Sequence, residues 1–305
     1  MTPERSAIDW IAVDWGTTRL RAWAMRGGQP QAARASDRGM GALSPETFEP
    51  ALLDLVADWL PAAGRMPVIA CGMVGARGGW VEADYRPTPC PPLDPRRAAV
   101  PPTSDPRLDV RILPGLSQAD PPDVMRGEET QIAGFLAGEP GFRGTLCLPG
   151  THSKWVRIAD GQVLGFRTFL TGELFALLAR QSVLRLTIAA AEPDPDACLQ
   201  AGRQALADPH AASSGLFALR AASLLQGLAP PQAAGRLSGL LIGAELAAAR
   251  AFWQAAPVAL IGAPRLTRLY ETLLLAAGAR ACHKDGGTAV LAGLAAARQA
   301  MLEET

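Results

Sequence analysis

Two stretches of the chain decide the fold: IDWIAVDWGTTRLRAWAM, residues 8–25, and TLCLPGTHSKWVRI, residues 145–158. Each has the pattern of a buried strand, a turn rich in glycine and hydroxyl residues, and a return strand, which together form a hairpin. Gly16 and Gly150 occupy matching places in the two turns, and each hairpin opens one half of the chain. This repeat predicts an internal structural duplication.

The hydrophobic spacing of the remaining chain predicts both strands and helices. Further strands are expected at 67–71, 110–113 and 258–261, and the proline-rich stretch 87–122 is otherwise expected to be largely loop. Helices are expected over 46–60, 128–137, 172–186, 196–207, 216–228 and 237–253, from Thr267 onward, and over 289–303. The pattern predicts an α/β protein whose second half is mainly helical.

Composition excludes several classes of protein. The 305 residues carry 29 basic and 29 acidic side chains, and 49% are hydrophobic, which is not typical of a disordered chain. Zero net charge argues against nucleic-acid binding, and no apolar stretch approaches the ~20 residues of a membrane span. The first residues lack an apolar leader pattern, and the five scattered cysteines favour no disulfide framework or zinc site. We expect a cytoplasmic protein with buried cysteines.

The first turn has the residue types of a phosphate loop. Gly16, Thr17 and Thr18 would offer backbone N–H and side-chain O–H groups to phosphate oxygens. Asp14, at the end of the preceding strand, could hold Mg²⁺ through water, because Mg²⁺ keeps several waters and takes few carboxylates. An ordinary hairpin turn is the alternative interpretation.

The second turn strengthens the phosphate interpretation. Gly150 and Thr151 repeat the donor pattern, and His152 could donate to phosphate or shape the turn. Lys154 follows directly, and only Lys154 and Lys284 are lysines among the 29 basic residues. Lys154 would supply the compact positive charge that a transferring phosphoryl group needs. Two such hairpins could grip a polyphosphate from both sides.

Two further groups carry chemistry. Glu128 and Glu129, at the start of a predicted helix between the halves, could accept the proton of a hydroxyl that attacks phosphorus; acidic capping of the helix is the alternative. Arg126 could bind a substrate carboxylate through paired hydrogen bonds. Gly243, Gly262 and Ala263 could allow close approach of adenine and ribose, although helix packing explains Gly243 equally well.

Six segments resemble the 2-dehydro-3-deoxygalactonokinase family, within the sugar-kinase/actin/heat-shock ATPase superfamily. They are IAVDWGTTRLRAW (11–23), GMVGARGGWVEADY (72–85), MRGEETQIAG (125–134), LPGTHSKWV (148–156), FRTFLTGEL (166–174) and SGLLIGAE (238–245). The resemblance implies two RNase H-like, actin-like ATPase domains with a cleft between them. We expect them at 1–137 and 138–305, and the final helix, 289–305, could pack on the first domain.

The family phosphorylates the 6-hydroxyl of 2-dehydro-3-deoxy-D-galactonate with ATP, in galactonate breakdown, so the resemblance implies ATP, Mg²⁺ and a small sugar acid as ligands. It implies catalytic roles for Asp14, Lys154 and one of the two adjacent glutamates. Its acidic substrate requires a cation, for which Arg19, Arg77 and Arg126 are candidates, with Trp80 as a further substrate contact. Most sugar kinases have Asp as the base, and Gly287 stands where the family has an acidic residue.

Two other functions remain open at the level of sequence. The same fold could phosphorylate another sugar or sugar acid, because fold alone does not set the acceptor. A non-enzymatic, nucleotide-switched binding or filament protein is the second alternative. No nucleic-acid or membrane partner is expected, and self-association into a homo-oligomer is left open.

Overall fold

A computed structural model describes residues 8–303 of the chain. Its internal contacts divide it into two compact units. The first contains Met1–Phe142, Asp160–Val163 and Gly287–Thr305, and the second contains Arg143–Ala159 and Leu164–Gly286. The chain therefore leaves and re-enters the first unit twice, a pattern that a single cut at residue 137 cannot describe.

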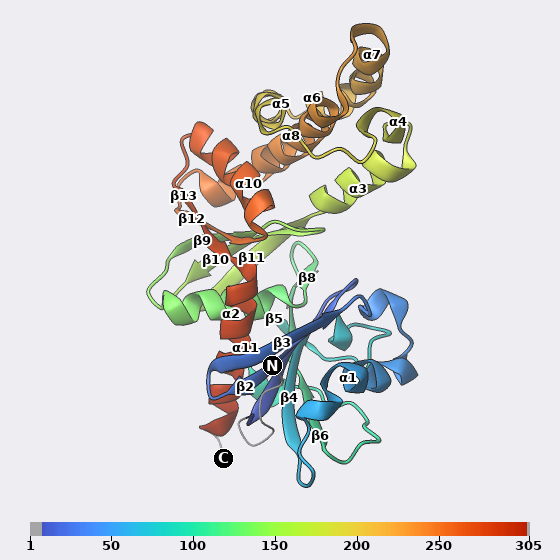
Figure 1. Ribbon diagram of the computed structural model, residues 1–305. Coiled ribbons are helices and arrows are strands. Elements are labelled where there is room, and N and C mark those ends of the chain that lie inside the picture. Colours follow the sequence, from blue (N-terminus) through green and yellow to red (C-terminus); the bar gives the residue numbers. More distant parts are fainter. Residues whose placement is uncertain (1–7, 304–305) are drawn as a thin grey trace. The chain divides into compact units, whose positions relative to one another are not determined.

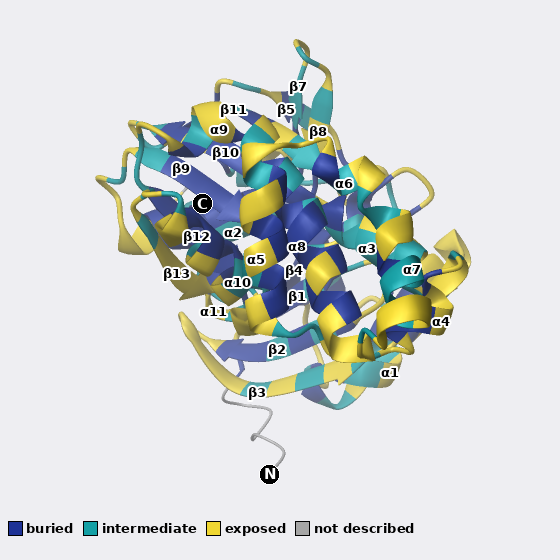
Figure 2. Ribbon diagram, turned by 90° about the horizontal axis from the view of Figure 1, so that it is seen from above, coloured by how far each residue is buried: buried dark blue, intermediate teal, exposed yellow. Residues whose placement is uncertain are grey.

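The first unit contains a five-stranded sheet in the order β3-β2-β1-β4-β6. These strands are β1 (Trp10–Trp15), β2 (Leu20–Arg26), β3 (Gln29–Ser36), β4 (Met66–Gly72) and β6 (Leu108–Ile112). The first three pair antiparallel through the predicted hairpin, whereas β1, β4 and β6 run parallel. Sequence reasoning missed β3, because its mostly exposed side chains lack an apolar face; Figure 2 shows it as an exposed edge.

Helices cover both faces of this sheet. On one face, α1 (Phe48–Val56) packs with Trp15 and Trp59, and on the other α11 (Gly286–Leu302) packs against Trp10 and Ala12; Figure 1 shows α11 running beside the blue strands. A third helix, α2 (Glu128–Gly138), crosses α11 where two glycines meet. A Cβ on Gly134 would overlap the Ala289 carbonyl, and one on Gly293 would overlap that of Thr130. This close crossing fixes where the α2 N-terminus lies.

The second unit repeats the sheet, in the order β11-β10-β9-β12-β13. Its strands are β9 (Gly144–Leu148), β10 (Ser153–Ala159), β11 (Gln162–Phe169), β12 (Val258–Gly262) and β13 (Ala281–Asp285). Again an antiparallel hairpin leads into parallel neighbours. The predicted duplication and the two RNase H-like sheets are confirmed. Lys284 lies on β13, a largely exposed edge strand, where it pairs with Ile261 of β12.

Eight helices of the described chain belong to the second unit: α3 (Thr171–Gln181), α4 (Arg185–Ile188), α5 (Pro195–Ala207), α6 (Ala211–Ser214), α7 (Leu216–Gln226), α8 (Pro230–Ala248), α9 (Arg250–Trp253) and α10 (Pro264–Ala276). The longest, α8, lies against α5 along a stripe of glycines four residues apart. Cβ atoms on Gly235, Gly239 and Gly243 would overlap the α5-side carbonyls of Asp194, Cys198 and Gly202. The packing interpretation of Gly243 is therefore the one that the structure supports.

The proline-rich stretch is more ordered than expected. It contributes to a small sheet of β5 (Tyr85–Pro87), β7 (Gly115–Gln118) and β8 (Asp123–Met125), whose short strands give little periodic signal. Short 3-10 turns occur at Met40–Ala42, Pro45–Thr47, Ala57–Trp59, Met73–Gly75 and Pro95–Arg97. Within residues 8–303, no helix has the length and apolar character needed to cross a membrane. Four cysteines are buried as expected, but Cys282, on β13, is exposed.

Candidate functional site

The predicted residues fall into two groups, one in each unit, and each group is described by itself. In the first unit, the hairpin turn is held by its backbone. The Gly16 amide donates to the Arg19 carbonyl at 2.8 Å, and the Gly41 amide donates to the Thr17 carbonyl at 2.9 Å. Residue 39 must be glycine, because a Cβ there would overlap the Thr17 carbonyl. The turn is thus fixed while the Thr17 and Thr18 side chains stay exposed.

Asp14 lies at the end of β1, between β2 and β4. Its carboxylate forms an ion pair with Arg21 and accepts a weak hydrogen bond from the Cys71 thiol at 4.0 Å. Burial, followed by the charges of Asp14 and Glu129, raises the pKa of Cys71 well above its usual value, so this thiol stays protonated. Gly72 follows with φ 93°, and a Cβ there would lie 2.7 Å from the Trp15 carbonyl oxygen. The positive φ of Gly72 lets the chain bend tightly beside Asp14.

Asp14 also suits the predicted magnesium ion. Among residues 8–303 there is no group of three or more His, Cys, Asp or Glu side chains that could hold a metal. Mg²⁺ bound to a nucleotide needs no such group, because phosphates and water supply most of its ligands. A single, partly exposed carboxylate beside a phosphate-type turn is a fitting protein contribution.

The N-terminus of α2 meets the end of β4. Gly127 precedes the helix with φ 103°, and a Cβ there would lie 3.2 Å from the Gly72 Cα. Glu129 is completely buried and turns back over this end: its Oε2 accepts from the Gly127 amide at 2.6 Å, and its Oε1 accepts from the Thr130 hydroxyl at 3.0 Å. Burial, assisted by the charge of Glu128, raises the pKa of Glu129 to about 7. Glu128 is partly exposed, and its Oε2 accepts from the Arg126 amide at 3.1 Å.

Arg126 is buried, yet two of its nitrogens have no hydrogen-bond partner among the described residues. The Nη2 atom donates to the Ala83 carbonyl at 2.6 Å, and the guanidinium lies 4.2 Å from the centre of the Tyr85 ring. The Nε and Nη1 atoms are buried without a partner. A buried guanidinium with unused N–H groups is costly unless a ligand supplies acceptors.

The other predicted substrate contacts behave differently. Arg19 is exposed and pairs with Asp37 at 3.5 Å, and Arg77 is an exposed turn residue. Trp80 belongs to the core, where its ring stacks on Phe48 at 6.4 Å with 13° between the planes. The structure therefore corrects the prediction for Trp80: its indole packs the first unit and does not present its face to a ligand.

In the second unit, the second turn lies on the N-terminus of α3. Residue 172 must be glycine, because a Cβ there would overlap the Gly150 carbonyl. The Glu173 amide donates to the Thr151 carbonyl at 2.9 Å, and the Glu173 carboxylate lies 2.6 Å from the His152 ring. His152 thus shapes the turn. A helix N-terminus below a turn of this kind favours bound anions.

Lys154 lies in β10, two residues beyond the end of the turn, and is buried. Ser153 and Trp155 on either side both reach the helical layer formed by α8 and α10. Because side chains alternate along a strand, Lys154 lies on the opposite face of the sheet.

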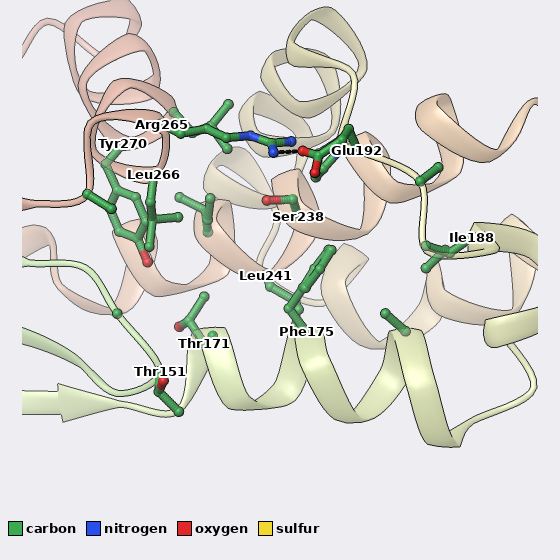
Figure 3. A pocket seen from close by; sticks show the side chains of 18 of the residues that line it. Thr151, Thr171, Phe175, Ile188, Glu192, Ser238, Leu241, Arg265, Leu266 and Tyr270 are labelled. Atoms are coloured by element: carbon green, nitrogen blue, oxygen red, sulfur yellow. Dashed lines mark ion pairs between the residues drawn. The ribbon is translucent and has the colours of Figure 1, made fainter. Parts of the chain in front are cut away.

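A cavity of about 600 Å³ opens beside the second turn, within the range of small-ligand pockets. Gly150, Thr151 and Thr171 line one end, and Phe175, Leu241 and Leu266 are among its apolar walls. In Figure 3 an ion pair of Arg265 and Glu192 spans the other end. Ala263 lines the cavity, and Gly262 lies just before it at the end of β12. Gly243 is not among the lining residues; it packs on Gly202 instead.

Sequence reasoning missed Glu245, whose carboxylate lies at the centre of a buried cluster beside this cavity. It accepts from Trp155 Nε1 at 2.7 Å, from the Tyr270 hydroxyl at 2.8 Å and from the Thr171 hydroxyl. Burial raises the pKa of Glu245, and these hydrogen bonds oppose that shift. A charged residue inside the apolar run LLIGAELAAA was the available signal.

A family model described as 2-keto-3-deoxy-galactonokinase matches residues 14–297. This chain belongs to that family. The resemblance seen in the sequence motifs is thereby confirmed, and with it membership of a family of carbohydrate kinases, which are transferases.

Individual relatives support the assignment. A Rhizobium meliloti (strain 1021) protein named "Probable 2-dehydro-3-deoxygalactonokinase DgoK1" is 42% identical over 96% of this chain and 97% of its own length. The Escherichia coli (strain K12) 2-dehydro-3-deoxygalactonokinase is 35% identical over 93% and 96%, respectively. A crystal structure from Sinorhizobium meliloti, described under the same enzyme name, covers 96% of this chain and 99% of its own, with a TM-score of 0.87 and 42% identity.

Proposed function

We propose that this chain transfers the γ-phosphoryl group of ATP to the 6-hydroxyl of 2-dehydro-3-deoxy-D-galactonate, giving the 6-phosphate and ADP in D-galactonate catabolism. The family and its named relatives indicate this reaction class. The structural observation that supports an acidic acceptor is the side chain of Arg126. Its guanidinium is buried, and two of its nitrogens have no partner among the described residues. Arg126 lies two residues before the start of α2.

Arg126 is the group that binds the substrate carboxylate. Its position is fixed by the hydrogen bond to Ala83 and by the Tyr85 ring, so the remaining N–H groups point in set directions. A carboxylate accepting from them would satisfy the donors that the described protein leaves unpaired. Arg19 and Arg77, both exposed, are secondary candidates for the same charge.

Glu129 is the general base. As the 6-hydroxyl oxygen forms its bond to the γ-phosphorus, the hydroxyl proton passes to the Glu129 carboxylate and the bond to the bridging oxygen of ADP breaks. A pKa of about 7 suits this task, because such a carboxylate is ionised often enough to accept a proton and basic enough to hold it. Glu128, which is more exposed, is the alternative base.

The nucleotide occupies the second unit, with adenosine in the cavity beside Ala263 and phosphates at Gly150 and Thr151. Lys154 supplies positive charge to the transferring group, and the exposed Thr17 and Thr18 of the first turn donate to its oxygens, while the Gly16 amide, which donates to Arg19, holds the turn. Mg²⁺, held at Asp14 through water, would neutralise phosphate charge as the reaction proceeds. We further propose a cytoplasmic setting, which the free cysteines support.

An ADP-release assay with a panel of 2-keto-3-deoxy sugar acids tests this function. We expect turnover that depends on the acid and is highest for the galactonate derivative. Equal or higher turnover with a different sugar acid or a neutral sugar would change the acceptor. Release of ADP that no acceptor stimulates would overturn the proposed function.

A further inference from the structure

The helical layer of the second unit contains a buried carboxylate with no role in the phosphoryl transfer described above. Glu245 lies on α8, is almost fully buried, and receives hydrogen bonds from three different elements: Trp155 on β10, Thr171 at the start of α3, and Tyr270 on α10. Burying a charged group costs free energy, and these hydrogen-bond donors stabilise the Glu245 carboxylate in this layer.

The cluster extends to the second phosphate turn. The Ser153 hydroxyl lies 3.0 Å from the Tyr270 hydroxyl, whose own proton is donated to Glu245. Ser153 must therefore donate to Tyr270, and a chain of donors runs from Ser153 through Tyr270 to Glu245. Ser153 is the first residue after the turn, so the carboxylate determines the hydrogen-bond direction at one end of the turn.

The Glu245 carboxylate also holds Thr171, at the start of α3, the helix on which the second turn lies. Thr171 donates to Glu245 and is followed by Gly172, where a Cβ would overlap the Gly150 carbonyl. Thr171 and Tyr270 both line the 600 Å³ cavity; Figure 3 shows them on neighbouring walls of that cavity, near Thr151. A shift of either side chain would change the cavity wall and the turn together.

We infer that Glu245 is a positioning residue for nucleotide binding, which holds the second phosphate turn and two walls of the adjacent cavity in one arrangement. The inference rests on the nucleotide site of the proposed function and adds a residue that touches neither the nucleotide nor the sugar acid. Glu245 keeps three hydrogen-bond donors directed at one carboxylate. Its loss should therefore weaken nucleotide binding more than binding of the acceptor.

Glu245→Gln is the sharpest variant, because it keeps the side-chain shape. An amide has one acceptor and one donor end, so it cannot accept from Trp155, Thr171 and Tyr270 together. If its NH₂ group faces the two hydroxyls, the donor chain to Ser153 reverses; if it faces Trp155, two donors oppose each other. Either arrangement disturbs the turn without leaving a large cavity.

The experiment measures binding of a non-hydrolysable ATP analogue by calorimetry, and the KM values for ATP and for the sugar acid. For Glu245→Gln we expect about tenfold weaker analogue binding, the loss expected for one disturbed buried hydrogen bond, with a similar rise in KM for ATP. The KM for the sugar acid should change less than about twofold, a split that general loss of stability would not produce.

Glu49→Gln is the matched control. Glu49 is another buried glutamate, in the first unit, whose carboxylate accepts from the Ser104 and Asp105 amides. This control should lower thermal stability and leave analogue binding unchanged. Tyr270→Phe removes only one hydroxyl and should weaken analogue binding in the same direction. The double variant with Glu245→Gln should then lose less than the product of the two single effects.

Unchanged analogue binding in Glu245→Gln, or an equal loss in Glu49→Gln, would overturn the inference. If Glu245→Gln does not fold, Tyr270→Phe decides, and wild-type affinity in that variant would count against the inference. Analogue binding is measured without any acceptor, so it can be observed even if the sugar-acid assay, which tests the proposed function, fails. A wild-type chain that does not bind the analogue would overturn both.

Discussion

The two five-stranded sheets share one strand order but differ at the ends of their first hairpins. In the first unit, Asp14, one residue before the end of β1, forms an ion pair with Arg21, and Glu129 is completely buried. In the second, β10 begins with Ser153 and Lys154, and the buried carboxylate, Glu245, is covered by donors. The duplicated fold thus supplies an acidic end in one unit and a cationic, donor-rich end in the other.

Glu129 gives the largest expected effect, because a reacting carboxylate cannot be replaced by an amide. Glu129→Gln should lower kcat by ~10²–10⁴-fold, the usual contribution of a general base, whereas Glu128→Gln should lower it by less than about tenfold. Steady-state kinetics with ATP and the sugar acid measure both, and analogue binding should persist. The reverse order of effects would assign the base to Glu128.

Lys154 tests the cationic side of the comparison. Lys154→Ala should lower kcat by about 10²-fold, because a buried charge that stabilises the transferring group is lost. Lys284→Ala is the matched control, since it removes the other lysine of the same sheet from an exposed edge strand and should have little effect. Full activity of Lys154→Arg would show that charge alone suffices and that lysine geometry is not required.

Arg126 tests whether the first unit recognises the acid. Arg126→Ala should raise the KM for the sugar acid by about 10–100-fold, the loss expected for a charge-assisted hydrogen bond in a buried site. The KM for ATP should change little. Arg77→Ala, which removes an exposed arginine of the same unit, should change either value less than about twofold. Equal effects of the two variants would remove the specific role of Arg126.

Glu129 also predicts opposite pH dependences of activity and stability. Its pKa of about 7 lies above the ordinary 4.5, so the folded chain binds the proton more tightly than the unfolded chain does. The stability that tighter proton binding by Glu129 gives the folded chain is fully present below pH 4.5 and is lost as pH rises through about 7. Around pH 7 kcat should rise instead, because the ionised carboxylate is the base. At pH 8, Glu129→Gln should increase the free energy of unfolding by about 1–3 kcal/mol, measured by urea denaturation. No gain at pH 8 would contradict the raised pKa.

Gly243 should give the smallest effect on activity. Gly243→Ala places a methyl group against the Gly202 carbonyl and should cost about 1–3 kcal/mol of stability, the usual effect of overpacking. Its KM for ATP should stay at the wild-type value, because the residue does not line the cavity. Gly141→Ala, where a Cβ meets nothing within 4 Å, is the control. A selective rise in the KM for ATP would restore the nucleotide role first considered for Gly243.

Local patterns predicted much of the fold. The two hairpins, β4, β12 and the start of α2 follow from apolar runs bounded by turn residues, which are encoded within short stretches. By contrast, β3 and β13 are exposed edge strands, so neither shows an alternating apolar face; pairing with a neighbour gives them their structure. The short strands β5, β7 and β8 were hidden among prolines for a similar reason.

The candidate site divides in the same way. Contiguous motifs encode the residue types of the phosphate turns, the paired glutamates and the family, so these could be predicted from the amino-acid sequence. Folding, by contrast, buries Glu129 beside Gly127, leaves two Arg126 nitrogens without a partner among residues 8–303, packs Trp80 in the core, and brings donors from three elements to Glu245. Burial and convergence depend on residues far apart in the chain, which no local pattern encodes.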